Sequence, residues 1–246
     1  MNSLAVIPDF KVSPMNIAAS EDMYGLSVTF DRIRIPTGGS TTFEVPIDDT
    51  NFKPEKELIC VIVDHHAART YWKERSQNQA PDCASPDGVS GTASPVSGLE
   101  WAGSSRHCAD CPLDAWGSDG GRGKACKELR RLYLLRPGDT FPLLLTLPPT
   151  SLLNFGNYLG KRVLPTGLRL YQVVTRITLE RVVSKAGNPF ARACFTLVGR
   201  LNDETAQAVA AYAKQIQALT RGRAPEADDY QAGASTTTDV NSEETF

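Results

Sequence analysis

The chain has 246 residues, with 26 Lys or Arg, 28 Asp or Glu, a formal net charge of −2 and a hydrophobic content of 41%. This length suits one sizeable domain, or one domain with an insertion and tails. No apolar run approaches the ~20 residues of a membrane span, and the opening MNSLAVIPDFKVS lacks the basic start and apolar run of a signal peptide. We therefore expect a soluble cytoplasmic protein with no membrane contact.

The charges are unevenly distributed along the chain. Residues 1–223 contain all 26 basic residues and 22 acidic ones, a net charge of +4, whereas residues 224–246 contain six acids and no base. The composition of this last segment predicts a disordered acidic tail. We divide the chain into a main domain, 1–223, with an insertion at about 74–130, and the tail, 224–246.

The first half of the chain predicts three strands and a long loop. Residues 25–36 alternate as a strand, and residues 38–47 read as its partner after a Gly-Gly turn. Residues 56–72 predict a buried strand that is followed by polar and aromatic residues. Residues 74–125 show little periodicity, and so long a loop is uncommon unless it is functional, disordered or pinned. Strand character resumes at 131–135 and 140–149.

The second half predicts two helices around a hairpin. Residues 149–163 and 202–222 have helical patterns, and 168–185 and 189–201 form the clearest pair of strands. The expected N-caps are Thr150 or Ser151 and Asn202 or Asp203. This order predicts a mainly β (α+β) fold, an OB-like Greek-key barrel with a loop insertion and a C-terminal helix. A β-sandwich is the alternative, because strand count alone does not separate the two.

Four of the six cysteines lie in the insertion. Cys108 and Cys111 form a Cys-x2-Cys pair, with Cys83 before it and Cys126 after it. In the reducing compartment expected here, clustered thiols bind metal more often than they pair. Four thiolates complete a tetrahedral, structural Zn²⁺ site, and metal binding supplies the free energy that orders the loop. We therefore predict a structural Zn²⁺ bound by these four residues. His107 is an alternative fourth ligand. The competing interpretation is that the four thiols are free and unrelated.

Basic and aromatic residues surround these cysteines. All three tryptophans lie between residues 72 and 116, in a polar, glycine-rich setting that core packing explains poorly. Aromatic rings stack on unpaired bases, at roughly 1–3 kcal/mol per base, while cations contact phosphates. A second basic face is expected along residues 169–181. The alternative there is the solvent-exposed side of a two-faced sheet. The predicted nucleic-acid contacts are Tyr71, Trp72, Lys73, Trp101, Arg106, Trp116, Arg122, Lys124, Lys127, Arg130, Arg131, Tyr133, Arg169, Tyr171 and Arg176.

The tail offers a second kind of binding site. Its terminal aromatic and the acids before it suit a basic pocket on a partner protein, or the chain's own cationic surface when nucleic acid is absent. A solubility tail is the alternative. The predicted partner-binding residues are Asp239, Glu243, Glu244 and Phe246.

The ending EETF and the segment CADCPLDAWGSDGGRGKACKELRRLYLL resemble single-stranded DNA-binding proteins of phages and mobile elements, over roughly residues 20–220 and the final residues. The resemblance implies a non-enzymatic protein that coats single-stranded DNA with little sequence preference during replication and recombination. It also implies a bacterial host cell, association with the nucleoid, and recruitment of replication and recombination proteins through the tail. The tail lacks the Ile-Pro before Phe of cellular versions, which favours a phage or plasmid partner.

The sequence is also compatible with other ligands and other functions. Stacking platforms tolerate RNA as well as DNA, and a homo-oligomer is not decided. A metal-dependent nuclease or zinc hydrolase would need a carboxylate cluster or an open metal position, for which Asp64, His65 and His66 are the one candidate group. A zinc loop that binds protein is a third interpretation. We predict that the protein is not an enzyme.

Overall fold

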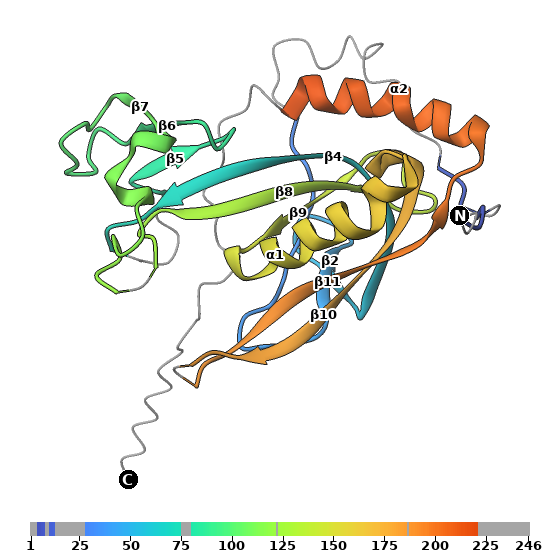
Figure 1. Ribbon diagram of the computed structural model, residues 1–246, viewed down its shortest axis with the longest axis horizontal. Helices are drawn as coiled ribbons and strands as arrows, with labels where there is room; N and C mark the ends of the chain where they lie inside the picture. Colours follow the sequence, from blue (N-terminus) through green and yellow to red (C-terminus); the bar gives the residue numbers. More distant parts are fainter. Residues whose placement is uncertain are drawn as a thin grey trace.

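The computed structural model describes residues 4–7, 10–12, 28–74, 80–121, 123–185 and 187–220 (Figure 1). Its strands are β1 Arg32–Ile33, β2 Phe43–Pro46, β3 Phe52–Glu55, β4 Glu57–Tyr71, β5 Cys83–Ser85, β6 Ser90–Ala93, β7 Ser105–His107, β8 Lys127–Leu135, β9 Leu143–Leu147, β10 Val173–Val183 and β11 Pro189–Arg200. The helices are α1 Pro149–Tyr158 and α2 Asp203–Thr220, with a π turn at Leu159–Val163 and 3₁₀ turns at Cys108–Asp110, Pro112–Asp114, Leu164–Thr166 and Leu170–Gln172. None of these helices is long and apolar enough to cross a membrane. The predicted mainly β fold is confirmed.

The strands form a branched, mixed sheet. Nine strands are connected, in the order β1-β9-β8-β4-β5-β6-β7, with β10 on β4 and β11 on β10, while β2 and β3 form a separate pair. β1 and β9 are parallel, and the other pairs are antiparallel. The described strands do not close into a barrel, so the OB-like Greek key is not confirmed.

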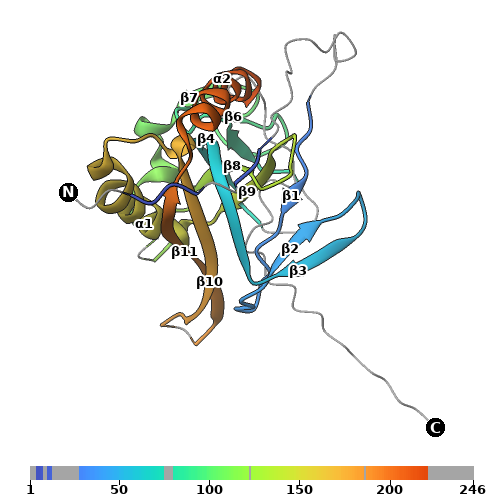
Figure 2. The ribbon, with the colours of Figure 1, turned by 90° about the vertical axis from the view of Figure 1, so that its right-hand side faces the viewer.

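The length of β4 explains the branching. Its first residues, 57–60, pair with β10, whereas residues 61–70 pair with β8 and residues 69–71 also pair with β5. A single strand of 15 residues thus belongs to three strand pairs at different points. Figure 2 shows the β2–β3 and β10–β11 hairpins on either side of the lower end of β4.

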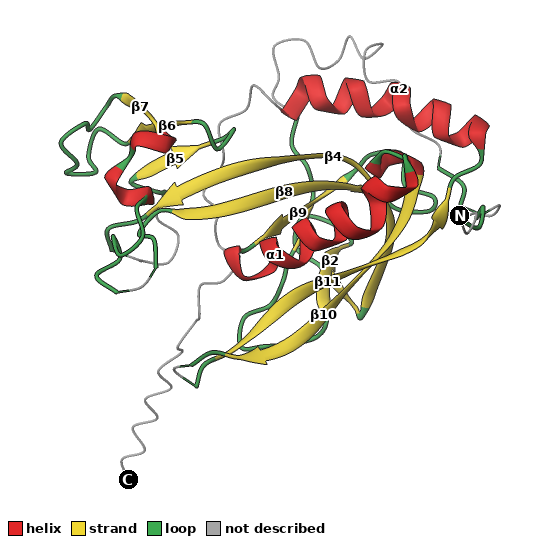
Figure 3. Cartoon of the chain, viewed as in Figure 1, coloured by secondary structure: helices red, strands yellow, loops and turns green. Residues whose placement is uncertain are grey.

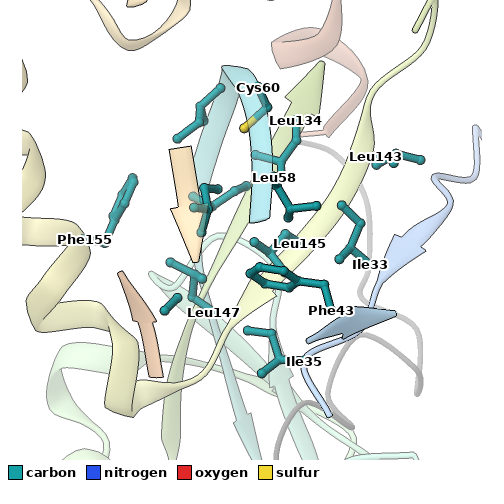
Figure 4. Packing of buried hydrophobic residues seen from close by; sticks show 14 of the residues in the cluster. Ile33, Ile35, Phe43, Leu58, Cys60, Leu134, Leu143, Leu145, Leu147 and Phe155 are labelled. Carbon is teal, nitrogen blue, oxygen red and sulfur yellow. The ribbon is translucent and has the colours of Figure 1, made fainter. Parts of the chain in front are cut away.

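Alternation along β4 and β8 builds a core on each face of the sheet. Leu58, Cys60 and Ile62 join one cluster, which includes Phe155 of α1 (Figure 4). Val61 and Val63 belong to a second cluster, which is covered by α2. Since successive strand residues point to opposite faces, the apolar run in β4 serves both clusters.

The two helices differ in how they begin. Asn202 Oδ1 accepts a hydrogen bond from the Thr205 N–H (2.8 Å), which confirms one of the expected caps of α2. α1 begins at Pro149 with no side-chain cap, so the Thr150 or Ser151 prediction is wrong. Ser151 Oγ instead accepts a hydrogen bond from Ala193 N–H of β11 (3.0 Å).

The predicted first strand pair is also largely wrong. β2 pairs with β3, and its link to the preceding segment is a single bridge between Arg34 and Glu44. The hairpin predicted at 168–201 is confirmed as β10 and β11. The segment predicted as an irregular loop contains β5, β6 and β7, a small antiparallel unit at the far end of β4 and β8 from α2 (Figure 3).

Candidate metal and nucleic-acid site

All four insertion cysteines line one cavity. Cys83 lies on β5, Cys108 and Cys111 flank the turn after β7, and Cys126 directly precedes β8. The cavity has a volume of about 20 Å³, which is room for one body the size of a water molecule. The cysteines that the sequence spreads over 44 positions are therefore brought together by the fold.

Short turns and a glycine create this arrangement. Cys111 N–H donates to the Cys108 carbonyl (3.2 Å), and Cys126 N–H donates to the Leu113 carbonyl (2.9 Å). A Cβ added to Gly91 would lie 3.2 Å from Cys83 Sγ and 3.4 Å from Cys108 Sγ. A side chain at position 91 would therefore crowd both sulfurs.

The four thiols are free, and burial disfavours the charged thiolate at three of them. None of the six cysteines forms a disulfide. Burial raises the pKa of Cys83 to about 11 and that of Cys126 to about 12, and it also raises the pKa of Cys108, because a charged thiolate loses its hydration there. Among the described residues, no group of three or more His, Cys, Asp or Glu side chains is arranged so that it could hold a metal ion. The four sulfurs line one cavity, but they are not arranged as the ligands of a bound ion are.

Polar groups from the sheet and the insertion border the same cavity. Arg69 of β4 forms an ion pair with Asp114, and Lys124 Nζ lies 3.0 Å from Asp114 Oδ1. The Nε atom of Arg69 and the Nε1 atom of Trp101 are buried and have no hydrogen-bond acceptor. Both side chains line the cavity together with the four sulfurs. This network could not be read from the sequence, in which Asp114 is simply an acid among cations.

Two cation–aromatic pairs lie on the insertion. The Trp116 side chain is 79% exposed, and Lys124 Nζ lies 5.6 Å from its ring centroid. The Arg106 guanidinium lies 4.5 Å from the ring centroid of Trp101, which is half-buried. The structure thus places four of the predicted nucleic-acid contacts on one small unit.

The other predicted contacts near the insertion differ in how far their side chains are exposed to solvent. Lys73 is exposed, Tyr71 and Trp72 are half-buried at the end of β4, and Lys127 Nζ donates to the Lys124 carbonyl. Arg122 lies outside the described residues, as do all four predicted tail residues, Asp239, Glu243, Glu244 and Phe246.

Two residues of β8 that were predicted to contact nucleic acid are buried, so they cannot serve as surface contacts. Arg131 is 3% exposed and Tyr133 is 2% exposed, with the Tyr133 ring 4.9 Å from that of Phe30. Arg130, on the opposite face, is half-buried, and its Nη1 lies 2.8 Å from His65 Nδ1. The reason is strand alternation, since a run of charges on a central strand is divided between two covered faces.

The second basic face lies far from the insertion. Arg169 is exposed and Tyr171 is half-buried at the turn before β10, while Arg176 is ion-paired with Glu57 (3.4 Å). Arg176 is opposite Ile59 in register, eleven residues along β4 from its last pairings with β8. At ~3.3 Å per residue this is roughly 36 Å, so the two faces do not form one compact site.

The candidate catalytic group is split by the same alternation. His65 faces α1, with its ring 5.3 Å from that of Phe155. On the other face, Asp64 Oδ2 accepts a hydrogen bond from Thr220 Oγ1 of α2 (2.9 Å), and His66 Nδ1 lies 3.9 Å from the same oxygen. Both of these side chains are buried, at 8% and 5% exposure. The three residues therefore do not converge on one open position.

Comparisons of the chain with family models, with curated proteins and with solved structures found no match.

Proposed function

We propose that the protein binds single-stranded nucleic acid, with DNA as its main ligand and little sequence preference, and that the insertion carries the contact surface. The observation that carries this proposal is Trp116. Its indole is 79% exposed on the insertion, beside the cation of Lys124. An exposed indole contributes little to folding, whereas it provides a flat surface on which any base can stack.

The cations around Trp116 suit the phosphate of a nucleotide whose base stacks on the indole. Lys124 is held between Asp114 and the ring, so its ammonium lies at a defined distance from the stacking surface. Arg106 is exposed and stacks on Trp101, which repeats the combination of a cation and an aromatic ring. Repeated pairs of this kind suit successive nucleotides, whose bases and phosphates alternate along a strand.

The resemblance to single-stranded DNA-binding proteins of phages and mobile elements supports the same function. It is carried by the segment Cys108–Leu135 and by the final residues of the chain. On this basis we propose a non-enzymatic role in replication or recombination in the bacterial cytoplasm, at the nucleoid, with the acidic tail recruiting partner proteins. The OB-like barrel of that resemblance is not required, because the proposed contacts lie on the insertion.

A titration tests the proposal. The full chain is titrated with a fluorescein-labelled oligo-dT, and both anisotropy and tryptophan emission are recorded from 50 to 300 mM salt. We expect binding that quenches tryptophan and weakens with salt, with log Kd changing by ~0.7 per log salt for each phosphate contact. Double-stranded DNA of the same length and oligo-rU measure the preference for DNA single strands. Absence of binding at low salt, or binding without quenching and without salt dependence, would refute the proposal.

A further inference from the structure

We infer that the cavity of the insertion is a tetrathiolate metal site, formed by Cys83, Cys108, Cys111 and Cys126, that takes one Zn²⁺ per chain. Arg69 and Trp101 are positioned to hydrogen-bond its sulfurs. This inference is independent of nucleic-acid binding, because it depends on the interior of the insertion and not on its surface.

The four sulfurs come from segments that are held in place separately. Cys83 is fixed by the pairing of β5 with both β4 and β6, and Cys126 leads directly into β8. Cys108 and Cys111 share the turn that follows β7. A single ion bound to all four would therefore join the strands at the far end of the sheet to the loops that cover them.

The size and chemistry of the cavity suit Zn²⁺. Four Zn–S bonds of about 2.3 Å place tetrahedral sulfurs about 3.8 Å apart. The cavity has room for one small body, and Gly91 leaves open the space next to two of the sulfurs. Binding converts four thiols into four thiolates and releases four protons to solvent, so the site gains a net charge of −2. Soft thiolates favour Zn²⁺ over Mg²⁺ or Ca²⁺, which prefer oxygen ligands.

A second observation points to negative sulfur in this cavity. Arg69 Nε and Trp101 Nε1 are buried N–H donors that line the cavity and lack acceptors. Buried donors are nearly always paired, so two orphans in one place indicate a missing acceptor. A neutral thiol is a weak acceptor, whereas a metal-bound thiolate accepts N–H hydrogen bonds well. The positive charge of Arg69 also offsets part of the −2.

The metal would also order the contact surface. Arg69 pairs with Asp114, Asp114 with Lys124, and Lys124 lies over Trp116. A thiolate that holds Arg69 therefore supports this whole series of contacts. Trp101, which lines the same cavity, likewise has the Arg106 guanidinium over its ring.

The test is a measurement of metal content and coordination on the full chain, purified under reducing conditions. We expect one zinc per chain by elemental analysis. Exchange for Co²⁺ should give the visible d–d bands of a tetrahedral ion and the near-ultraviolet charge-transfer band of thiolate ligands. Cys111→Ser should weaken these bands, whereas Cys194→Ser is the matched control, because its sulfur lies on β11 outside the cavity.

Trp101→Phe keeps all four thiols and removes one N–H donor. We expect it to bind the metal 10- to 100-fold more weakly, the usual effect of losing a partner of a ligand. This variant and the unmodified chain decide the question even if a cysteine variant fails to fold.

Three results would overturn the inference: no uptake of Zn²⁺ or Co²⁺ by the reduced chain, a cobalt spectrum without thiolate charge transfer, or equal effects of Cys111→Ser and Cys194→Ser. Disulfides among the four cysteines in freshly purified protein, found as a mass deficit without metal, would also overturn it. An unchanged metal affinity in Trp101→Phe would remove that residue from the site.

Discussion

Replacement of Trp116 by alanine separates nucleic-acid binding from folding. The residue is 79% exposed, so roughly 50 Å² of the ~250 Å² that a tryptophan can bury is buried in the folded protein. The alanine variant loses this buried area. At ~25 cal/mol per Å², this costs folding about 1 kcal/mol. Loss of one stacked base should cost binding ~1–3 kcal/mol, a 5- to 150-fold increase in Kd. The loss of binding free energy should therefore equal or exceed the loss of folding free energy.

The assay is anisotropy with labelled oligo-dT, accompanied by urea unfolding of the same samples. Trp116→Phe keeps a stacking ring and should bind with intermediate affinity. Val96→Ala is the matched control, since Val96 is 90% exposed on the same insertion and is not aromatic. If Trp116→Ala and Val96→Ala bind oligo-dT equally well, Trp116 is not a stacking surface and the reasoning from exposure is refuted.

Three further predictions concern the fold. Tyr133→Ala should cost about 3–5 kcal/mol in urea unfolding, as expected for a buried aromatic residue, without changing the salt dependence of binding in the folded fraction. Ser151→Ala should cost ~1–3 kcal/mol because Ala193 N–H is left unpaired, whereas Thr150→Ala, at an exposed neighbour, should change stability by less than ~0.5 kcal/mol. Asn202→Ala should cost ~0.5–2 kcal/mol by loss of the cap of α2; an unchanged unfolding midpoint would contradict that cap.

Features set by neighbouring residues could be predicted from the sequence. The cap of α2 at Asn202 and the hairpin of β10 and β11 depend on short patterns, and both were predicted correctly. The grouping of Cys83 with the three later cysteines followed from their shared segment and is matched by the cavity.

Features that depend on distant pairing could not be predicted. The charge run that includes Arg130 and Arg131 shows neither that its strand is central nor which residues face α2. The branching of the sheet depends on β4 having different partners along its length, which no local pattern records. That Trp101 lines the same cavity as Cys83 likewise depends on the pairing of β5 with β6 and of β6 with β7.

The place where the insertion leaves and rejoins the sheet has a practical consequence. Thr70 of β4 and Lys127 of β8 are opposite each other in register, at the ~5 Å spacing of neighbouring antiparallel strands. A two-residue Asn-Gly turn could therefore link these two positions and make β4 and β8 an ordinary hairpin. Such a replacement would keep the pairing of β4 with β8, but it would remove Ala84, which packs against the buried pair of Ala68 and Leu129. The cavity would not travel whole with the insertion to another hairpin, because Arg69 of β4 lines it.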